Sequence, residues 1–142
     1  MQRALQEAQK AFDEGEVPVG AVIVVENQIV ASDHNRIEQL RNPIAHAEML
    51  VIQEACRKLQ YERLSSASLY VTVEPCVMCA GAILLARIQK LIYGTENPKA
   101  GAIRSLYTLV QDARLNHQVE VISGILRAEC SQLMIAFFRR LR

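Results

Sequence analysis

The chain has 142 residues, enough for a core of its own, and we treat residues 1–142 as a single domain. Apolar residues make up 51% and charged residues 22%, which excludes a disordered chain and a coiled coil. No apolar run approaches the roughly 20 residues needed to cross a bilayer. The polar first residues lack the apolar stretch of a signal peptide. We therefore expect a cytoplasmic protein that makes no contact with a membrane.

Charge is unevenly distributed along the chain. The net charge is only +1, but residues 1–85 carry seven Lys and Arg against eleven Asp and Glu. Residues 86–142 carry nine basic residues against four acidic ones. This asymmetry fits a basic face for a polyanion, and it fits equally well charges spread over solvated helices. Charge alone leaves both interpretations open.

The first elements follow from apolar periodicity. Residues 2–14 place their apolar side chains on one helical face, and Gly15 follows as a stop. The β-branched run 18–25 predicts a buried strand, residues 26–28 a turn, and residues 29–32 a hairpin partner. A polar loop covers about residues 34–42. The remaining elements are expected in the order helix 45–59, strand 68–73, helix 77–87, strand 89–93 ended by Gly94, short helix 106–111, strand 119–122 and helix 125–139.

An opening hairpin followed by alternating helices and strands predicts an α/β fold. The order α-β-β-α-β-α-β-α-β-α is typical of a mixed, five-stranded sheet with helices on both faces, which gives three layers, α/β/α.

Two cysteines and a histidine have the spacing of metal ligands. Cys76 and Cys79 lie three residues apart at a helix start, where the positive end of the helix favours thiolates. His46 lies at the start of the preceding long helix, and both helices adjoin the strand 68–73. Three ligands leave the fourth tetrahedral position of Zn²⁺ open for water, which is typical of catalytic zinc. A structural site would need a fourth ligand, and neither Cys56 nor Cys130 is well placed; both are expected to be buried apolar fillers.

Glu48 follows His46 by two residues, in the first turn of the same helix. There its carboxylate can lie beside a zinc-activated water without binding the metal, take the proton of the water and return it to a leaving group. An acid interacting with the helix dipole is the simpler alternative. Beside a His/Cys/Cys set we favour the catalytic role.

The pattern His46-Ala47-Glu48 with Pro75-Cys76-Val77-Met78-Cys79 resembles the signature of the cytidine-deaminase-like zinc enzymes. Longer segments are similar to the bacterial tRNA-specific adenosine deaminases: residues 16–22, 74–82, 99–102, 116–117 and 137–139. This resemblance implies the fold of that family, one Zn²⁺ per chain and a homodimer. It also implies conversion of the wobble adenosine in the anticodon loop of an arginine tRNA to inosine.

The resemblance also implies how the substrate is held. Asn35 would hydrogen-bond the flipped base, and the Ala47 backbone N–H would contact the base or the attacked centre. Phe138 and the arginines at 139, 140 and 142 resemble a tail that meets the anticodon stem-loop of tRNA. A turn asparagine and a core phenylalanine with a solvated charged end remain the structural alternatives. His34 and His117 are not expected to be ligands.

The zinc signature is shared by deaminases of free bases and nucleotides, so guanine, cytosine and dCMP are alternative substrates. A non-enzymatic alternative is an interaction module stabilised by zinc. The basic second half and the tail favour RNA.

Asn97 departs from the family pattern, which usually has an aspartate in the loop after the predicted strand 89–93. A carboxylate can accept from the ribose 2′-OH that distinguishes RNA from DNA, whereas an amide carries no charge to repel phosphates. We expect the native protein to discriminate between RNA and DNA hairpins of identical sequence less sharply than its Asn97→Asp variant does. Single-turnover rates on both hairpins measure this ratio. An equal ratio in the two proteins would make Asn97 an ordinary turn residue.

Overall fold

The computed structural model describes all residues, 1–142, in three layers around one mixed sheet. The strands are β1 (Gly20–Val25), β2 (Gln28–His34), β3 (Ser68–Val73), β4 (Lys90–Thr95) and β5 (Glu120–Ile122). The helices are α1 (Gln2–Asp13), α2 (Ala47–Leu59), α3 (Val77–Leu85) and α4 (Arg127–Arg140), with a 3-10 turn η1 at Leu109–Gln111. The predicted α/β class and the order of elements are confirmed.

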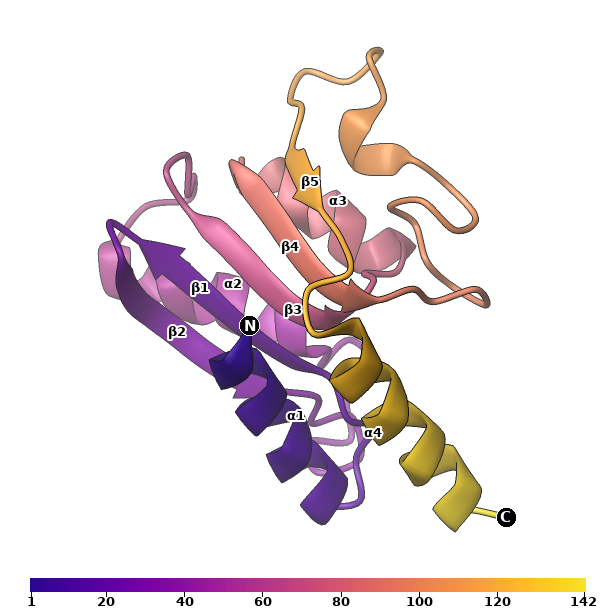
Figure 1. Ribbon diagram of the computed structural model, residues 1–142. Helices are drawn as coiled ribbons and strands as arrows, with labels where there is room; N and C mark the ends of the chain where they lie inside the picture. The colour runs from indigo at the N-terminus through magenta and orange to yellow at the C-terminus, as the bar shows by residue number, and fades with distance from the viewer.

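The sheet has the strand order β2-β1-β3-β4-β5. β1 is antiparallel to both β2 and β3, whereas β3, β4 and β5 are parallel to one another. Helices α1 and α4 cover one face of the sheet, and α2 and α3 cover the other (Figure 1). The predicted mixed, five-stranded sheet with helices on both faces is therefore confirmed.

The hairpin β1–β2 closes through a two-residue turn. Glu26 and Asn27 both have positive φ, 51° and 62°. Such a turn matches the right-handed twist of the flanking strands. The tight turn lets β2 start at Gln28 and continue to His34, so the second strand is longer than predicted. This extension brings His34 and the following Asn35 to one end of the sheet.

Two predicted boundaries in the second half are wrong. Gly94 does not end β4 but lies within it. Its lack of a side chain lets the last helix pack directly against the strand. A Cβ atom at Gly94 would lie 2.7 Å from the Thr72 carbonyl oxygen and 3.0 Å from Cβ of Cys130. The predicted short helix 106–111 forms only the 3-10 turn at Leu109–Gln111.

The core lies mainly between the sheet and the two helices α2 and α3. Fully buried side chains from these elements include Val51, Leu69 and Ile83, which belong to one continuous apolar cluster. Cys130 is buried as predicted, whereas Cys56 is only half-buried at the edge of this cluster. No helix is long and apolar enough to span a membrane.

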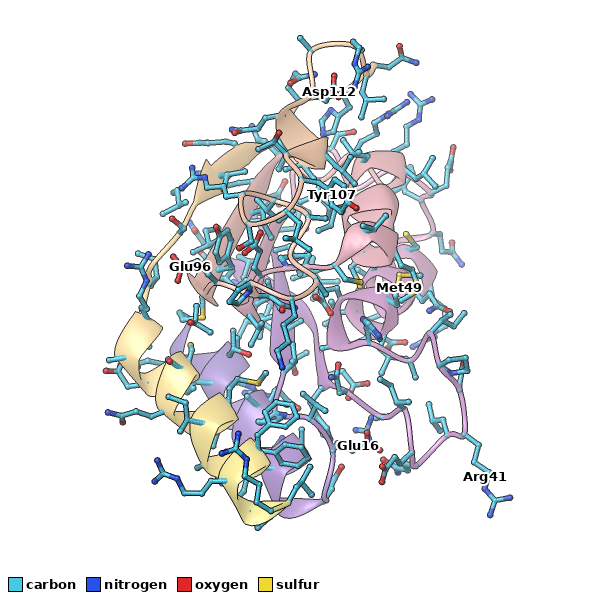
Figure 2. All side chains as sticks on the ribbon, turned by 90° about the vertical axis from the view of Figure 1, so that its right-hand side faces the viewer. Glu16, Arg41, Met49, Glu96, Tyr107 and Asp112 are labelled. Atoms are coloured by element: carbon cyan, nitrogen blue, oxygen red, sulfur yellow. The ribbon has the colours of Figure 1, made fainter.

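The loop between β2 and α2 leaves the body of the protein and returns to it. Arg41, near the tip of this loop, has a φ of 49° and projects away from the layers (Figure 2). The return segment ends at Ala45, which is buried and accepts a hydrogen bond from the Arg36 N–H. This contact closes the loop and sets the position at which α2 begins.

Candidate metal centre and base pocket

Helices α2 and α3 both begin at the carboxyl end of β3, and their first turns carry the three predicted metal donors. His46 and Cys76 are the N-cap residues of the two helices, each with extended backbone, and Cys79 lies one turn into α3. The Nδ1 atom of His46 lies 3.6 Å from the Sγ atom of Cys76 and 3.5 Å from that of Cys79. The structure therefore brings together three side chains from sites thirty residues apart in the sequence.

These distances fit a zinc ion. Tetrahedral zinc with Zn–N of about 2.0–2.1 Å and Zn–S of about 2.3 Å separates the nitrogen and sulfur donors by about 3.5 Å. The group of donor atoms consists of His46, Cys76 and Cys79 alone, so a fourth position is left for a small ligand. Of the other two cysteines, neither belongs to this group. The donor set can hold a metal of the kind that keeps an open coordination position.

The donors share protons in a way that prepares Cys76 for a metal. Hydrogen bonds from the Cys79 thiol and from His46 lower the pKa of Cys76 to about 4, against the opposing effect of burial. The hydrogen bond to Cys76 and burial raise the pKa of Cys79. The hydrogen bond with Cys76 also raises the pKa of His46. Since a metal needs both thiolates, its binding at neutral pH must release the proton held by Cys79.

Glu48 lies beside the donors but is not one of them. It is 4% exposed, and burial raises its pKa to about 7. A carboxyl group that changes its protonation state near neutral pH can both take and return a proton, which is what general acid–base catalysis requires. The role of Glu48 beside a metal-bound water stays a prediction.

A cavity of about 220 Å³ opens directly onto these groups. His46, Glu48 and Cys76 line its floor, and Asn35 lies at its wall. The buried Asn35 accepts, through Oδ1, a hydrogen bond of 2.8 Å from the Ala47 N–H, and no protein group accepts from its Nδ2. The Asn35 amide can therefore donate to a molecule in the cavity. Because the Ala47 N–H is already used by Asn35, its direct contact with a base stays a prediction.

A larger cavity adjoins the small one and shares four lining residues with it, Val17, Val73, Asn97 and Met134. Phe138, 45% exposed, lines this larger cavity together with Lys99, Arg139 and Arg142. Arg140 does not belong to this surface: it donates to the Phe12 carbonyl oxygen at 3.0 Å and stacks on the Phe12 ring. The predicted tail is thus divided, with Arg140 joining α4 to α1.

Glu74, the residue before Pro75, has a role that the sequence pattern alone does not indicate. Its buried carboxylate accepts hydrogen bonds from the N–H groups of Asn97, Ile103, Arg104 and Ser105, at 2.8–3.0 Å, and from the Ser105 hydroxyl. Although burial raises its pKa, these bonds outweigh burial and lower it. Glu74 thereby fixes the loop that follows β4 and forms one wall of the cavity. The only sequence feature that could have indicated this role is the position of Glu74 directly before Pro75 and Cys76.

Asn97 lines both cavities and so lies at their border. Its side-chain oxygen, however, accepts from the Ala100 N–H at 3.2 Å, which is a local turn contact. Its effect on the choice between RNA and DNA stays a prediction.

An open three-donor cluster with a buried acid at its edge, on this layered sheet, defines a hydrolytic deaminase of the cytidine-deaminase-like class. The sequence profile of the MafB19-like deaminases matches residues 1–142. The chain is 52% identical to the tRNA-specific adenosine deaminase of Bacillus subtilis (strain 168), over all of this chain and 88% of that protein. It is 44% identical to that of Agrobacterium fabrum (strain C58 / ATCC 33970), over all of this chain and 93% of the relative. The chain therefore belongs to the MafB19-like deaminases and to the family of the tRNA-specific adenosine deaminases.

Solved structures agree with this placement. A structure from work on A-to-I editing by tRNA:A34 deaminases at the wobble position superposes with a TM-score of 0.90 at 44% identity, covering 94% of this chain and 96% of the other. A guanine deaminase from Nitrosomonas europaea has the same fold, with a TM-score of 0.82 at 21% identity, covering 96% of this chain and 81% of that one.

Metal analysis of single-residue variants tests the site. We expect about one zinc per chain in the native protein, and loss of metal in His46→Ala and Cys76→Ala, because two remaining donors hold zinc poorly. Glu48→Gln should keep its zinc, since Glu48 is not a donor, and Cys56→Ala serves as the cysteine control. Inductively coupled plasma mass spectrometry of the purified proteins gives the ratio. Full zinc in a Cys76→Ala, Cys79→Ala double variant would contradict the assignment.

Proposed function

We propose that this protein is a zinc enzyme that deaminates the wobble adenosine of a tRNA, in the anticodon loop of an arginine tRNA, to inosine. The observation that carries the proposal is the junction of the two cavities. The small one is sized for a single base and contains His46, Glu48 and Asn35. The larger one carries an exposed aromatic ring and three basic side chains, which suit splayed bases and phosphates.

The names of the relatives support the same substrate. The relatives described above are tRNA-specific adenosine deaminases, and this chain matches them over nearly their full length. A target in an anticodon loop also suits the chemistry, since an unpaired nucleotide leaves its stack at low cost. A tRNA-modifying role is consistent with the expected cytoplasmic location. Residues 1–142 would then form a single catalytic domain.

His46, Cys76 and Cys79 would hold the zinc ion. Bound there, zinc supplies the Lewis acidity that lowers the pKa of water to about 7. Asn35 donates from Nδ2 to a ring nitrogen of the adenine and orients C6 towards the donor cluster. The Glu48 carboxylate takes a proton from the attacking water and passes it to the ring nitrogen next to C6. It then takes the second proton and delivers it to the departing amine, so that water is consumed and ammonia released.

Phe138, Arg139 and Arg142 would hold the nucleotides on either side of the target. Stacking on an aromatic ring and contacts to phosphates are both tolerant of sequence. Specificity for adenosine would therefore arise in the small cavity, through Asn35, and specificity for the loop in the larger one.

Product analysis on four substrates tests this function. Native protein incubated separately with tRNA, guanine, cytosine and dCMP should convert adenosine to inosine in the tRNA and leave the other three unchanged, as read by mass. Glu48→Gln should lose about 10²–10⁴-fold in rate, the usual contribution of general acid–base catalysis. Turnover of a free base or of dCMP, with no inosine in the tRNA, would favour the alternative function. Turnover of none of the four by a zinc-loaded protein would favour a zinc-stabilised interaction module.

We also propose that the protein is a homodimer with its active sites near the shared interface. Besides the family resemblance, the surface of α3 supports this proposal. Val77, next to the metal donor Cys76, is 51% exposed, and Leu85 at the other end of the helix is 78% exposed. Tyr107, in the loop that passes α3, is 54% exposed and is labelled in Figure 2. A partner subunit would remove this apolar surface from water.

Light scattering on the zinc-loaded protein tests the assembly. We expect a mass of about twice the 15.9 kDa of one chain. Leu85→Glu places a charge in the proposed interface and should shift the mass towards that of one chain. A fully active protein with the mass of one chain would refute the dimer.

A further inference from the structure

A buried histidine that the mechanism does not use lies between two carboxylates. His34, at the end of β2, is 1% exposed. Its Nδ1 atom lies 2.8 Å from an oxygen of Glu7, and its Nε2 atom lies 2.8 Å from an oxygen of Glu14. Both acids belong to the α1 region, Glu7 within the helix and Glu14 as its C-cap. The imidazole ring of His34 therefore joins β2 to α1 at two points, the middle of the helix (Glu7) and its C-terminal end (Glu14).

The two contacts together determine the charge of the ring. A neutral imidazole has one N–H donor and one lone pair, and an ionised carboxylate can only accept. With a neutral ring, one of the two contacts would place two lone pairs 2.8 Å apart. Both contacts are hydrogen bonds only when His34 carries a proton on each nitrogen. The geometry thus requires an imidazolium, unless a carboxyl group holds the extra proton.

The charged groups around the ring favour the ionised form of Glu7. Burial by itself raises the pKa of Glu7, but hydrogen bonds from His34 and Lys10 outweigh it and leave that pKa below its ordinary value. Glu14 is partly open to water, with 44% of its side chain exposed. The other charged groups on the packed elements are Arg3, 4.0 Å from Glu7, Asp33, 3.7 Å from His34, and Arg36, 2.7 Å from Asp33.

The ring lies where α1 touches the sheet most closely. Gly20 pairs with His34 across the β1–β2 ladder, and a Cβ atom on Gly20 would lie 2.5 Å from the Ala8 backbone nitrogen. The helix backbone therefore packs directly on β1 at this point, and α1 crosses the sheet beside β2 (Figure 1). Next to this close contact, His34 connects β2 to α1 through its two polar contacts.

The next residue in the chain is Asn35, whose amide faces the base pocket. Its backbone N–H donates to the Val19 carbonyl oxygen at 3.1 Å, and its Oδ1 accepts from Ala47. Val19 itself lines the pocket. A shift of the end of β2 would therefore move the Asn35 amide relative to the metal donors.

We propose that His34 is a positioning residue that, as an imidazolium bridging Glu7 and Glu14, holds Asn35 in place in the base pocket. Its role is exerted through Asn35, since the ring itself does not line either cavity. Loss of one carboxylate should leave zinc and the proton transfer by Glu48 in place but weaken the hold on the base. Uniform loss of base binding raises KM and leaves kcat nearly unchanged.

The charge of the ring is tested by NMR on the zinc-loaded native protein at neutral pH. Long-range ¹H–¹⁵N spectra should give nearly equal ¹⁵N shifts for the two nitrogens of His34, as an imidazolium requires. The chain has three histidines. His117, whose Nε2 donates to the Ile88 carbonyl oxygen, is assigned by its loss in His117→Asn, and His46 by its metal-bound nitrogen. Widely separated shifts for His34 would show a neutral ring and overturn the proposal.

The positioning role is tested by kinetics, and this arm rests on the proposed function. Glu14→Gln removes one carboxylate of the bridge, and Asp13→Asn is the matched control, since that neighbouring acid contacts only Gln9. With an RNA anticodon stem-loop, Glu14→Gln should raise KM about 2- to 30-fold, the range for mutations that act through an intervening contact. Asp13→Asn should leave KM unchanged, and Glu14→Asp should recover part of the loss.

An unchanged KM in Glu14→Gln, with zinc content and helical signal equal to the native protein, would overturn the positioning role. Failure of the native protein to deaminate the stem-loop would instead refute the proposed function. The NMR result would still decide the charge of His34 in that case, and the kinetic comparison would be made with whichever free base or nucleotide is turned over.

Discussion

The site depends on the meeting of two helix N-termini at the carboxyl end of one strand. β3 ends at Val73, and α3 begins four residues later with Cys76 as its N-cap, while α2 begins at the same end of the sheet with His46 as its N-cap. Each N-terminus directs backbone N–H groups and a partial positive charge at the same point, which favours thiolates there. Separating the helices by one ångström would misplace the donors, so the core that holds α2 and α3 against the sheet is also what defines the metal geometry.

The wall of the base pocket depends on a second buried interaction, that of Glu74 with the loop after β4. Five hydrogen bonds to one carboxylate fix this loop, and Gly101 is required within it because a Cβ atom there would meet the Asn97 carbonyl oxygen at 2.6 Å. Since Glu74 lies two residues before Cys76, the same short segment sets both a metal donor and the wall that faces it.

The two faces of the sheet serve different purposes. Helices α2 and α3 begin with the candidate metal donors and Glu48, whereas α1 and α4 cover the opposite face, and of these two helices only α4 lines the cavities. α4 contributes Met134 and Phe138 to the cavities, and α1 is joined to it through Arg140 on the Phe12 ring. On its other side α1 is held by His34, next to Asn35. Helix α4 therefore borders the cavity that contains His46 and Cys76, and α1 contacts both α4 and β2.

Much of this protein follows from local sequence. The apolar periods and turn residues predict the order of the elements and the layered sheet, because periods of 2 and 3.6 residues are properties of the chain itself. A three-donor site with an adjacent acid is predicted by the spacing of His46, Glu48, Cys76 and Cys79. The reason is that only the N-cap and first-turn positions of a helix can direct their side chains at one point beyond its N-terminus. The tertiary structure alone decided which polar side chains bind partners far away in the sequence. Glu74, His34 and Arg140 look like ordinary polar residues in the sequence, and each acquires its role from partners 31, 27 and 128 residues away. In the sequence, Gly94 resembles a strand end. Only the packing of α4 shows that Gly94 lies inside β4, at a position with no room for a side chain. Hydrogen bonds between distant residues depend on how the layers pack, and no local pattern encodes that arrangement.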